Sequence, residues 1–278
     1  MSTLSGKIAL VAEVANGHSI AAGCAQAMSD AGAELVLTYV NDTAKPYVDP
    51  VAKAVGAKQL LPLDVEVEGQ LEAVFDAIKT RWGRLDTLVH SIAFCTAEDP
   101  HGRVPDCSRA GFAQAMDISV HSLIRMARLA EPLMTKGGSI LTMTYFGGEK
   151  GGDHYNVMGP VKAALDAPMR ALAVEPGPKQ ICVNAISPGP LHTRAGSGIA
   201  HFDALIDAAH ARAFARAFAH AFPGAFPGAF PCAFPCAPEQ TLVTIKDVGE
   251  VAVMLASDGA HSVSGDTAYV DGGLHVRA

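Results

Sequence analysis

The chain has 278 residues, which is enough for one large domain or two small ones. Hydrophobic residues make up 49% of it and charged residues 18%, so we expect a globular protein with a sizeable core. The net charge is −7 and no basic cluster is present, so nucleic acid is not an expected partner. The sequence also has neither a signal-peptide pattern nor an apolar run long enough to span a membrane, so we expect no membrane partner and a cytoplasmic protein.

Short apolar runs predict buried strands along the whole chain. The expected strands are residues 8–11, 32–39, 59–63, 85–90, 139–144, 181–186 and 267–270. Helices are expected between them, in an alanine-rich segment ending near Ala31 and at residues 44–55, 67–82 and 112–134. This alternation predicts an α/β fold: a single Rossmann-like, doubly wound parallel sheet with helices on both faces.

The turn after the first strand has the build of a phosphate site. Strand 8–11 is followed by a small-residue turn up to Gly23 and then by the alanine-rich helix. A helix that begins directly after a strand can hold a diphosphate with its free N–H groups. Ser19 is a candidate N-cap or phosphate donor, and Asp42 follows the second strand where an acidic residue meets an adenosine ribose in dinucleotide folds.

Tyr155 and Lys162 form a candidate catalytic pair. Seven residues separate them, a spacing that returns a helix to nearly the same face about two turns along. A nearby ammonium favours phenolate character, and a phenol can donate to an oxygen that gains charge. A chance pairing on a helix surface explains the spacing equally well. Because the pair follows the fifth strand, however, we expect it in the crevice where ligands bind to such sheets.

Several motifs stand in one order along the chain. They are 14–21 at the first turn, 63–65, 90–93, Tyr145, 155–162, 183–190 with Thr193, 197–199, 243–249 and 270–273. In these motifs the chain resembles the short-chain dehydrogenase/reductase superfamily, and within it the divergent NADH-dependent enoyl-[acyl-carrier-protein] reductases. The resemblance covers nearly the whole chain. Its most specific part is the Tyr-x6-Lys spacing, since ordinary members of the superfamily have Tyr-x3-Lys.

The resemblance implies an activity and a set of site residues. NADH would deliver hydride to the β-carbon of a trans-2-enoyl thioester bound to acyl carrier protein. Tyr155 would hydrogen-bond the thioester oxygen, Lys162 would hold the nicotinamide ribose, and Tyr145 would line the acyl site. The positions that match cofactor contacts are Ala15, Ser19, Ile20, Asp64, Val65, Ser91, Ile92, Lys162, Leu191 and Thr193. Asp42 would repel a 2′-phosphate and so favour NADH, and a homotetramer is also implied.

Some of these residues have simpler interpretations. Val65, Ile92 and Leu191 could be core residues, and Ser91 and Thr193 could be turn residues. His154 and His90 are interpreted as structural rather than catalytic. The six cysteines show no zinc-site spacing, and no metal is expected.

Glu13 departs from the family pattern. The turn after the first strand usually opens with glycine, which allows the backbone to approach the cofactor closely. Here it reads Glu13-Val-Ala-Asn16, so a carboxylate is placed near the expected diphosphate. The hypothesis is that this carboxylate weakens NADH binding by repulsion.

A tandem repeat interrupts the chain at 213–236. Six tetrads carry phenylalanine at every fourth position, and four of them also carry proline, which is incompatible with a continuing helix. We expect one dinucleotide-binding and catalytic domain over 1–278, with 213–236 as an insertion in it. The insertion could be an apolar lid over the acyl chain or a tolerated surface loop, and we favour the loop.

Two other functions stay open. A carbonyl-reducing short-chain dehydrogenase would have Tyr-x3-Lys and an Asn-Asn-Ala-Gly-like turn where this chain has 90–93. A catalytically impaired or inactive homologue would be consistent with Glu13 and the insertion, but not with an intact Tyr155 and Lys162.

Overall fold

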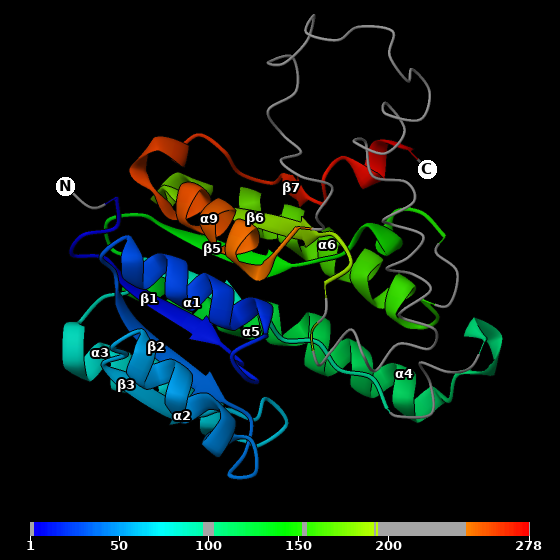
Figure 1. Ribbon diagram of the computed structural model, residues 1–278, viewed down its shortest axis with the longest axis horizontal. Helices are drawn as coiled ribbons and strands as arrows, with labels where there is room; N and C mark the ends of the chain where they lie inside the picture. Colours follow the sequence, from blue (N-terminus) through cyan, green and yellow to red (C-terminus); the bar gives the residue numbers. More distant parts are fainter. Residues whose placement is uncertain (1–2, 97–102, 152–154, 192, 194–242, 278) are drawn as a thin grey trace, which may run out of the picture.

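The computed structural model describes residues 3–96, 103–151, 155–191, 193 and 243–277. In these residues, seven strands form one sheet in the order β3-β2-β1-β4-β5-β6-β7, and every neighbouring pair is parallel (Figure 1). The strands are β1 (Ile8–Ala12), β2 (Glu34–Tyr39), β3 (Gln59–Pro62), β4 (Thr87–His90), β5 (Gly138–Met143), β6 (Ile181–Pro188) and β7 (Thr267–Val270). The predicted doubly wound parallel sheet is confirmed. Its strand order reverses between β1 and β4.

Helices cover both faces of this sheet (Figure 1). They are α1 (Ile20–Asp30), α2 (Lys45–Ala54), α3 (Gln70–Trp82), α4 (Arg109–Met116), α5 (Ser122–Ala130), α6 (Met158–Val174) and α9 (Ile245–Ala256). One hydrophobic cluster joins the sheet to α3, α4, α5 and α6, and the other joins it to α1, α2 and α9. None of the described helices is both long and apolar enough to cross a bilayer.

The long helix expected at 112–134 differs from the structure. It begins earlier, at Arg109, and a π-helical turn over Asp117–His121 separates α4 from α5. It ends in a 3-10 turn over Glu131–Leu133. A π turn inserts one extra residue into the helical ladder and so reorients the side chains that follow it, here from Ser122 onward.

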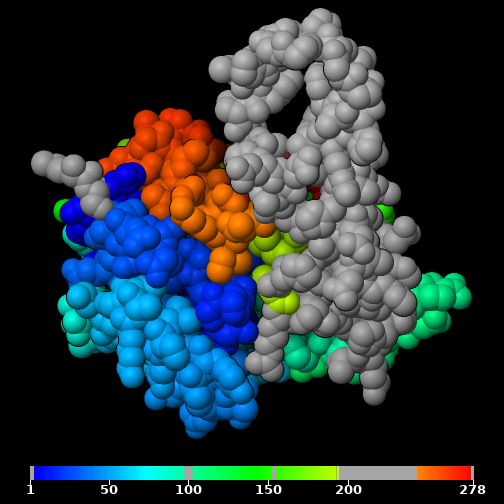
Figure 2. Space-filling model, viewed as in Figure 1, coloured from blue at the N-terminus to red at the C-terminus, as the bar shows by residue number. Residues whose placement is uncertain are grey.

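Two glycines bring the C-terminal helix back against the first one. A Cβ on Gly23 would lie 2.2 Å from the carbonyl oxygen of Ile245, and one on Gly249 would lie 2.4 Å from the carbonyl oxygen of Gly23. Only glycine therefore permits this crossing of α1 and α9. Figure 2 shows the two helices in direct contact on one face of the molecule. The crossing fixes α1, whose N-terminus points to the crevice described next.

Candidate active site

The sequence-predicted site residues follow the carboxyl ends of the strands. Because all the strands run parallel, the segments after β1, β3, β4, β5 and β6 meet at one edge of the sheet. The crevice between β1 and β4, where the order reverses, is the usual ligand site of such sheets.

The N-terminus of α1 is arranged to receive an anion. Ser19 caps the helix: its hydroxyl accepts a hydrogen bond from the N–H of Ala22 at 3.2 Å and donates to the carbonyl oxygen of Asn16 at 2.8 Å. The first N–H groups of a helix lack intrahelical acceptors, and Ser19 satisfies one of them. Ala15 lies in the preceding turn and Ile20 begins the helix.

Lys162 is a buried cation at the end of β5. Its side chain is on α6, and its Nζ donates a hydrogen bond to the carbonyl oxygen of Met143 at 2.7 Å. Burial lowers the pKa of Lys162 to about 8, while Asp166 and Glu13 act in the opposite direction. The structure thus holds a titratable ammonium inside the crevice.

Two tyrosine rings pack together beside it. The ring centroids of Tyr145 and Tyr155 are 4.6 Å apart, with an angle of 51° between the planes. Burial raises the pKa of the Tyr155 phenol well above its ordinary value, and Tyr145, Cys95 and Asp166 raise it further. Burial, with a contribution from Asp271, raises the pKa of Tyr145 to about 12. Near neutral pH both phenols are therefore protonated hydrogen-bond donors.

The predicted placement of Tyr155 and Lys162 on one helix face is wrong. Tyr155 precedes α6, which begins at Met158, and Asn156 between them has a φ of 50°. This left-handed conformation is incompatible with a continuous helix, and asparagine adopts it more readily than most residues. In the described structure no hydrogen bond joins Tyr155 to Lys162, and Lys162 is not among the groups that shift the pKa of Tyr155. Tertiary packing, not helical periodicity, brings both residues to the crevice.

Two glycines make this packing possible, and sequence reasoning gave them no role. A Cβ on Gly147 would lie 2.6 Å from the ring of Tyr155 and 3.0 Å from that of Tyr145. A Cβ on Gly148 would lie 2.8 Å from the backbone nitrogen of Ala163, beside Lys162. The Gly-Gly pair directly after Tyr145-Phe146 was the available signal. It allows both tyrosine rings and the start of α6 to approach the end of β5.

Glu13 lies in the crevice in a conformation that glycine would adopt more easily. Its φ is 59°, and its backbone N–H donates to Thr38 Oγ1 at 2.9 Å. Its Oε2 atom is buried and has no hydrogen-bond partner. Burial, together with the charge of Asp64, raises the pKa of the Glu13 carboxyl to about 8, and Lys162 partly opposes this shift. The charges of Asp64 and Lys162 therefore both act on this carboxyl.

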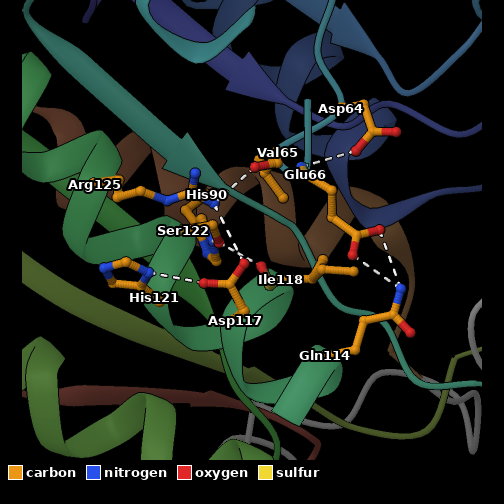
Figure 3. A network of polar contacts seen from close by, with 10 residues as sticks. All are labelled: Asp64, Val65, Glu66, His90, Gln114, Asp117, Ile118, His121, Ser122 and Arg125. Atoms are coloured by element: carbon orange, nitrogen blue, oxygen red, sulfur yellow. Dashed lines mark hydrogen bonds and ion pairs between the residues drawn. The ribbon is translucent and has the colours of Figure 1, made fainter. Parts of the chain in front are cut away.

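His90 is a structural histidine, as the sequence interpretation held. It is fully buried, and its Nδ1 atom lies 2.9 Å from Thr142 Oγ1. Its Nε2 atom lies 2.8 Å from Ser122 Oγ (Figure 3). Because the Ser122 hydroxyl donates to the carbonyl oxygen of Ile118, it accepts from His90, which assigns the proton to Nε2. Burial lowers the pKa of His90 to about 3, so the ring is neutral.

The loop after β3 is held from two directions. Asp64 accepts from the N–H of Glu66 at 3.0 Å through Oδ1, and its own N–H donates to Gln70 Oε1 at 2.8 Å. The guanidinium of Arg125 donates to the carbonyl oxygen of Val65 at 2.8 Å (Figure 3). These contacts fix Asp64 and Val65 at the rim of the crevice before any ligand binds.

Some of the other predicted cofactor-binding residues are part of the hydrophobic core. Val65 and Ile92 belong to one hydrophobic cluster and Leu191 to the other, while Ser91 and Thr193 are partly buried. His154, 197–199 and the 213–236 repeat lie outside the described residues. In the part of the chain that the structure describes, no group of three or more His, Cys, Asp or Glu side chains could hold a metal ion.

Two of these groups suit the binding of a dinucleotide, and a third one disfavours it. The α1 N-terminus suits a diphosphate, and the buried Lys162 cation suits ribose hydroxyls. The unpartnered carboxyl of Glu13 opposes an anion whenever it is ionised.

Comparison with known proteins gives a consistent result. A family model described as "Enoyl-(Acyl carrier protein) reductase" matches residues 14–223 and 224–275. The chain is 41% identical over 273 residues to an NADH enoyl-[acyl-carrier-protein] reductase of Rhizobium meliloti, covering 98% of this chain and 92% of the relative. It is 40% identical over 279 residues to one of Nostoc, covering 99% of both. A crystal structure of the enoyl-(acyl-carrier-protein) reductase of Anaplasma phagocytophilum in complex with NAD superposes with a TM-score of 0.86 at 40% identity, covering 98% of this chain and 95% of the other.

Proposed function

The chain belongs to the enoyl-[acyl-carrier-protein] reductase family of the short-chain dehydrogenases, and from that premise we propose that Tyr155, Lys162 and Tyr145 carry out its reaction. The activity is the NADH-dependent reduction of trans-2-enoyl thioesters in fatty acid synthesis, an oxidoreductase reaction at a carbon–carbon double bond. The observation that carries the assignment of residues is the buried ring of Tyr155, packed against Tyr145 at the end of β5.

When bound, NADH supplies the hydride that adds to the β-carbon of the substrate. Tyr155 donates a hydrogen bond to the thioester oxygen, where negative charge develops as the enolate forms. The high pKa of Tyr155 keeps the proton on the phenol, so the group acts as a donor and not as an anion. A proton taken up from solvent at the α-carbon completes the saturated product.

Lys162 holds the ribose hydroxyls of the cofactor and keeps positive charge near the developing enolate. Its hydrogen bond to Met143 directs the ammonium toward the end of β5. Because its pKa is lowered to about 8, a fraction of the lysine loses its charge in mildly alkaline solution. Tyr145, whose ring supports that of Tyr155, lines the acyl site.

The remaining cofactor contacts are proposed at the rim of the crevice. The α1 N-terminus with Ser19 receives the diphosphate, and Asp42, exposed after β2, disfavours a 2′-phosphate. The full proposed set is Ala15, Ser19, Ile20, Asp64, Val65, Ser91, Ile92, Lys162, Leu191 and Thr193.

The finer properties of the protein are also proposals. We expect a single catalytic domain over 1–278, with 213–236 as a surface insertion, that acts as a cytoplasmic homotetramer on substrates carried by acyl carrier protein. Deleting 213–236 and measuring turnover of long-chain enoyl thioesters tests the lid alternative; faster or slower turnover supports a lid, and unchanged kinetics supports a surface loop.

One assay tests the function. NADH oxidation is followed with crotonyl thioesters of acyl carrier protein and of coenzyme A, and with acetoacetyl thioester as the carbonyl substrate. Turnover of the crotonyl substrates that is lost in Tyr155→Phe supports the proposal. Turnover of the acetoacetyl substrate alone would identify a carbonyl reductase. NADH binding without any turnover would identify an inactive homologue, which the Glu13 departure motivates.

A further inference from the structure

Glu13 is a titratable group inside the crevice to which the proposed mechanism gives no role. It follows the carboxyl end of β1, a strand in the interior of the sheet, at the point where the strand order reverses. The backbone N–H groups of Glu13 and Val14 each donate a hydrogen bond to Thr38, at 2.9 Å. These two bonds hold the left-handed conformation of Glu13 in place. The backbone of Glu13 is therefore fixed at the end of β1, and the Oε2 atom of its side chain is buried.

Two charged side chains act on this carboxyl, and a neutral histidine lies on the neighbouring strand. Asp64 follows β3 and repels the ionised form, whereas Lys162 on α6 attracts it. His90, at the end of the neighbouring strand β4 and in register with Ala12, is neutral and uses both ring nitrogens in hydrogen bonds. Thr38 of β2 contributes no charge. Lys162 makes no ion pair with Glu13 in the described structure, and Glu13 Oε2 has no partner at all.

We propose that Glu13 is a cofactor-site residue that couples NADH binding to a proton: the dinucleotide binds when the Glu13 carboxyl is protonated and is released more readily when it is ionised. This inference rests on the proposed function, since it places the dinucleotide in the same crevice. It makes Glu13 a determinant of cofactor affinity that relatives with glycine at this turn do not have.

The chemistry of the carboxyl supports this coupling. In its protonated form it carries one O–H donor, and a diphosphate oxygen can accept that hydrogen bond. In its ionised form it has only acceptors, and it repels the diphosphate in a crevice of low dielectric constant. Glu13 and Lys162 titrate in the same range, with pKa values of about 8 each, and they do so as a pair. The charge of the pair therefore changes from net positive to net negative as the pH rises through that range.

The experiment measures NADH and NAD dissociation constants by fluorescence and calorimetry between pH 6.5 and 9 in the full-length protein. For a carboxyl that titrates near pH 8, the dissociation constant of the wild type rises about tenfold between pH 7 and pH 9 beyond any change caused by Lys162. Glu13→Gln keeps the shape and a donor without the titration, so between pH 7 and pH 9 it should retain only the change in affinity that Lys162 causes. Glu13→Gly is the second variant; because glycine accepts the left-handed φ freely, it also guards against loss of folding. Glu72→Gln, on the exposed face of α3, controls for the change in net charge.

The outcomes separate the two proposals. A pH dependence that is about tenfold weaker in Glu13→Gln and Glu13→Gly than in the wild type, and unchanged in Glu72→Gln, supports the coupling. Equal pH dependence in the wild type and both Glu13 variants overturns it and assigns the effect to Lys162. Turnover of crotonyl thioester is measured separately at pH 6.5. If turnover is absent while NADH binding depends on pH as predicted, the proposed function is overturned and the coupling is not. If turnover is present while NADH binding does not depend on pH, the coupling is overturned and the proposed function is not.

Discussion

The Nζ atom of Lys162 lies 2.7 Å from the carbonyl oxygen of Met143, the last residue of β5. This hydrogen bond joins α6 to the sheet at the crevice, and it sets the position of the only proposed catalytic residue that carries a positive charge.

Replacing Lys162 tests this position. In Lys162→Met the charged donor is lost, and we expect NADH binding to weaken about 10- to 100-fold, in line with the ~1.5–3 kcal/mol of a charged hydrogen bond. Lys162→Arg restores the charge but not the compact ammonium, so it should recover only part of the affinity. The NADH dissociation constants of both variants are measured at pH 7. Full recovery of the affinity in Lys162→Arg would contradict the proposed contact between the Lys162 ammonium and the ribose.

Tyr155→Phe tests the role of the phenol. The ring still packs against Tyr145, so the melting temperature should stay nearly unchanged while kcat falls about 100- to 1,000-fold, as for the loss of an oxyanion donor. Tyr145→Phe is the matched variant. We expect a smaller fall in kcat for it, because Tyr145 is proposed to line the acyl site and the Tyr155 hydroxyl is retained. If both variants lose equal activity, Tyr155 has no special role at the thioester oxygen.

Gly148→Ala should displace the start of α6. Its Cβ would lie 2.8 Å from the backbone nitrogen of Ala163, so the helix that carries Lys162 must move or the protein must absorb about 1–3 kcal/mol of overpacking. We expect lower thermal stability together with weaker NADH binding. Gly151→Ala, where nothing lies within 4 Å of the added Cβ, is the control, and an equal effect of the two would argue against this steric role.

Glu13 also gives a pH-dependent contribution to stability. Its folded pKa of about 8 lies above the ordinary value of 4.5, so the folded state binds more protons than the unfolded state between these values. The stability of the wild type relative to Glu13→Gln therefore falls as pH rises from 4.5 through 8, by an amount on the order of a few kcal/mol. Unfolding free energies at pH 5 and pH 9 check this: Glu13→Gln should have its largest advantage at pH 9. A pH-independent difference would show that the carboxyl is hydrated.

His90 gives the free energy of unfolding the opposite pH dependence, at acid pH. Its folded pKa of about 3 lies below the ordinary value of 6.5, so the unfolded state binds more protons between them and stability falls as the pH drops from 6.5 toward 3. In His90→Gln this slope should be flatter, although the variant is less stable at pH 7 because Thr142 and Ser122 lose fitted partners. Denaturant titrations at pH 7 and pH 4 compare the two slopes. Parallel curves would mean that a group other than His90 governs acid unfolding.

The sequence by itself determined the sheet and the set of loops that form the crevice. Alternating apolar runs and helices fix a doubly wound parallel sheet, because such strands must be covered on both faces. Ser19 at the start of α1 and Tyr145 after β5 then follow from chain order, since parallel strands place their carboxyl ends at one edge.

Only the tertiary structure decided how the side chains in the crevice meet. Periodicity placed Tyr155 and Lys162 on one helix face, but the helix begins only at Met158, after Tyr155 and the left-handed Asn156. Packing across Gly147 and Gly148 positions the two residues instead. The burial of Glu13, and the action of the Asp64 and Lys162 charges on it, were equally hidden, because these residues are far apart in the chain. Desolvation depends on all neighbours in space, and a linear pattern contains only the neighbours in sequence.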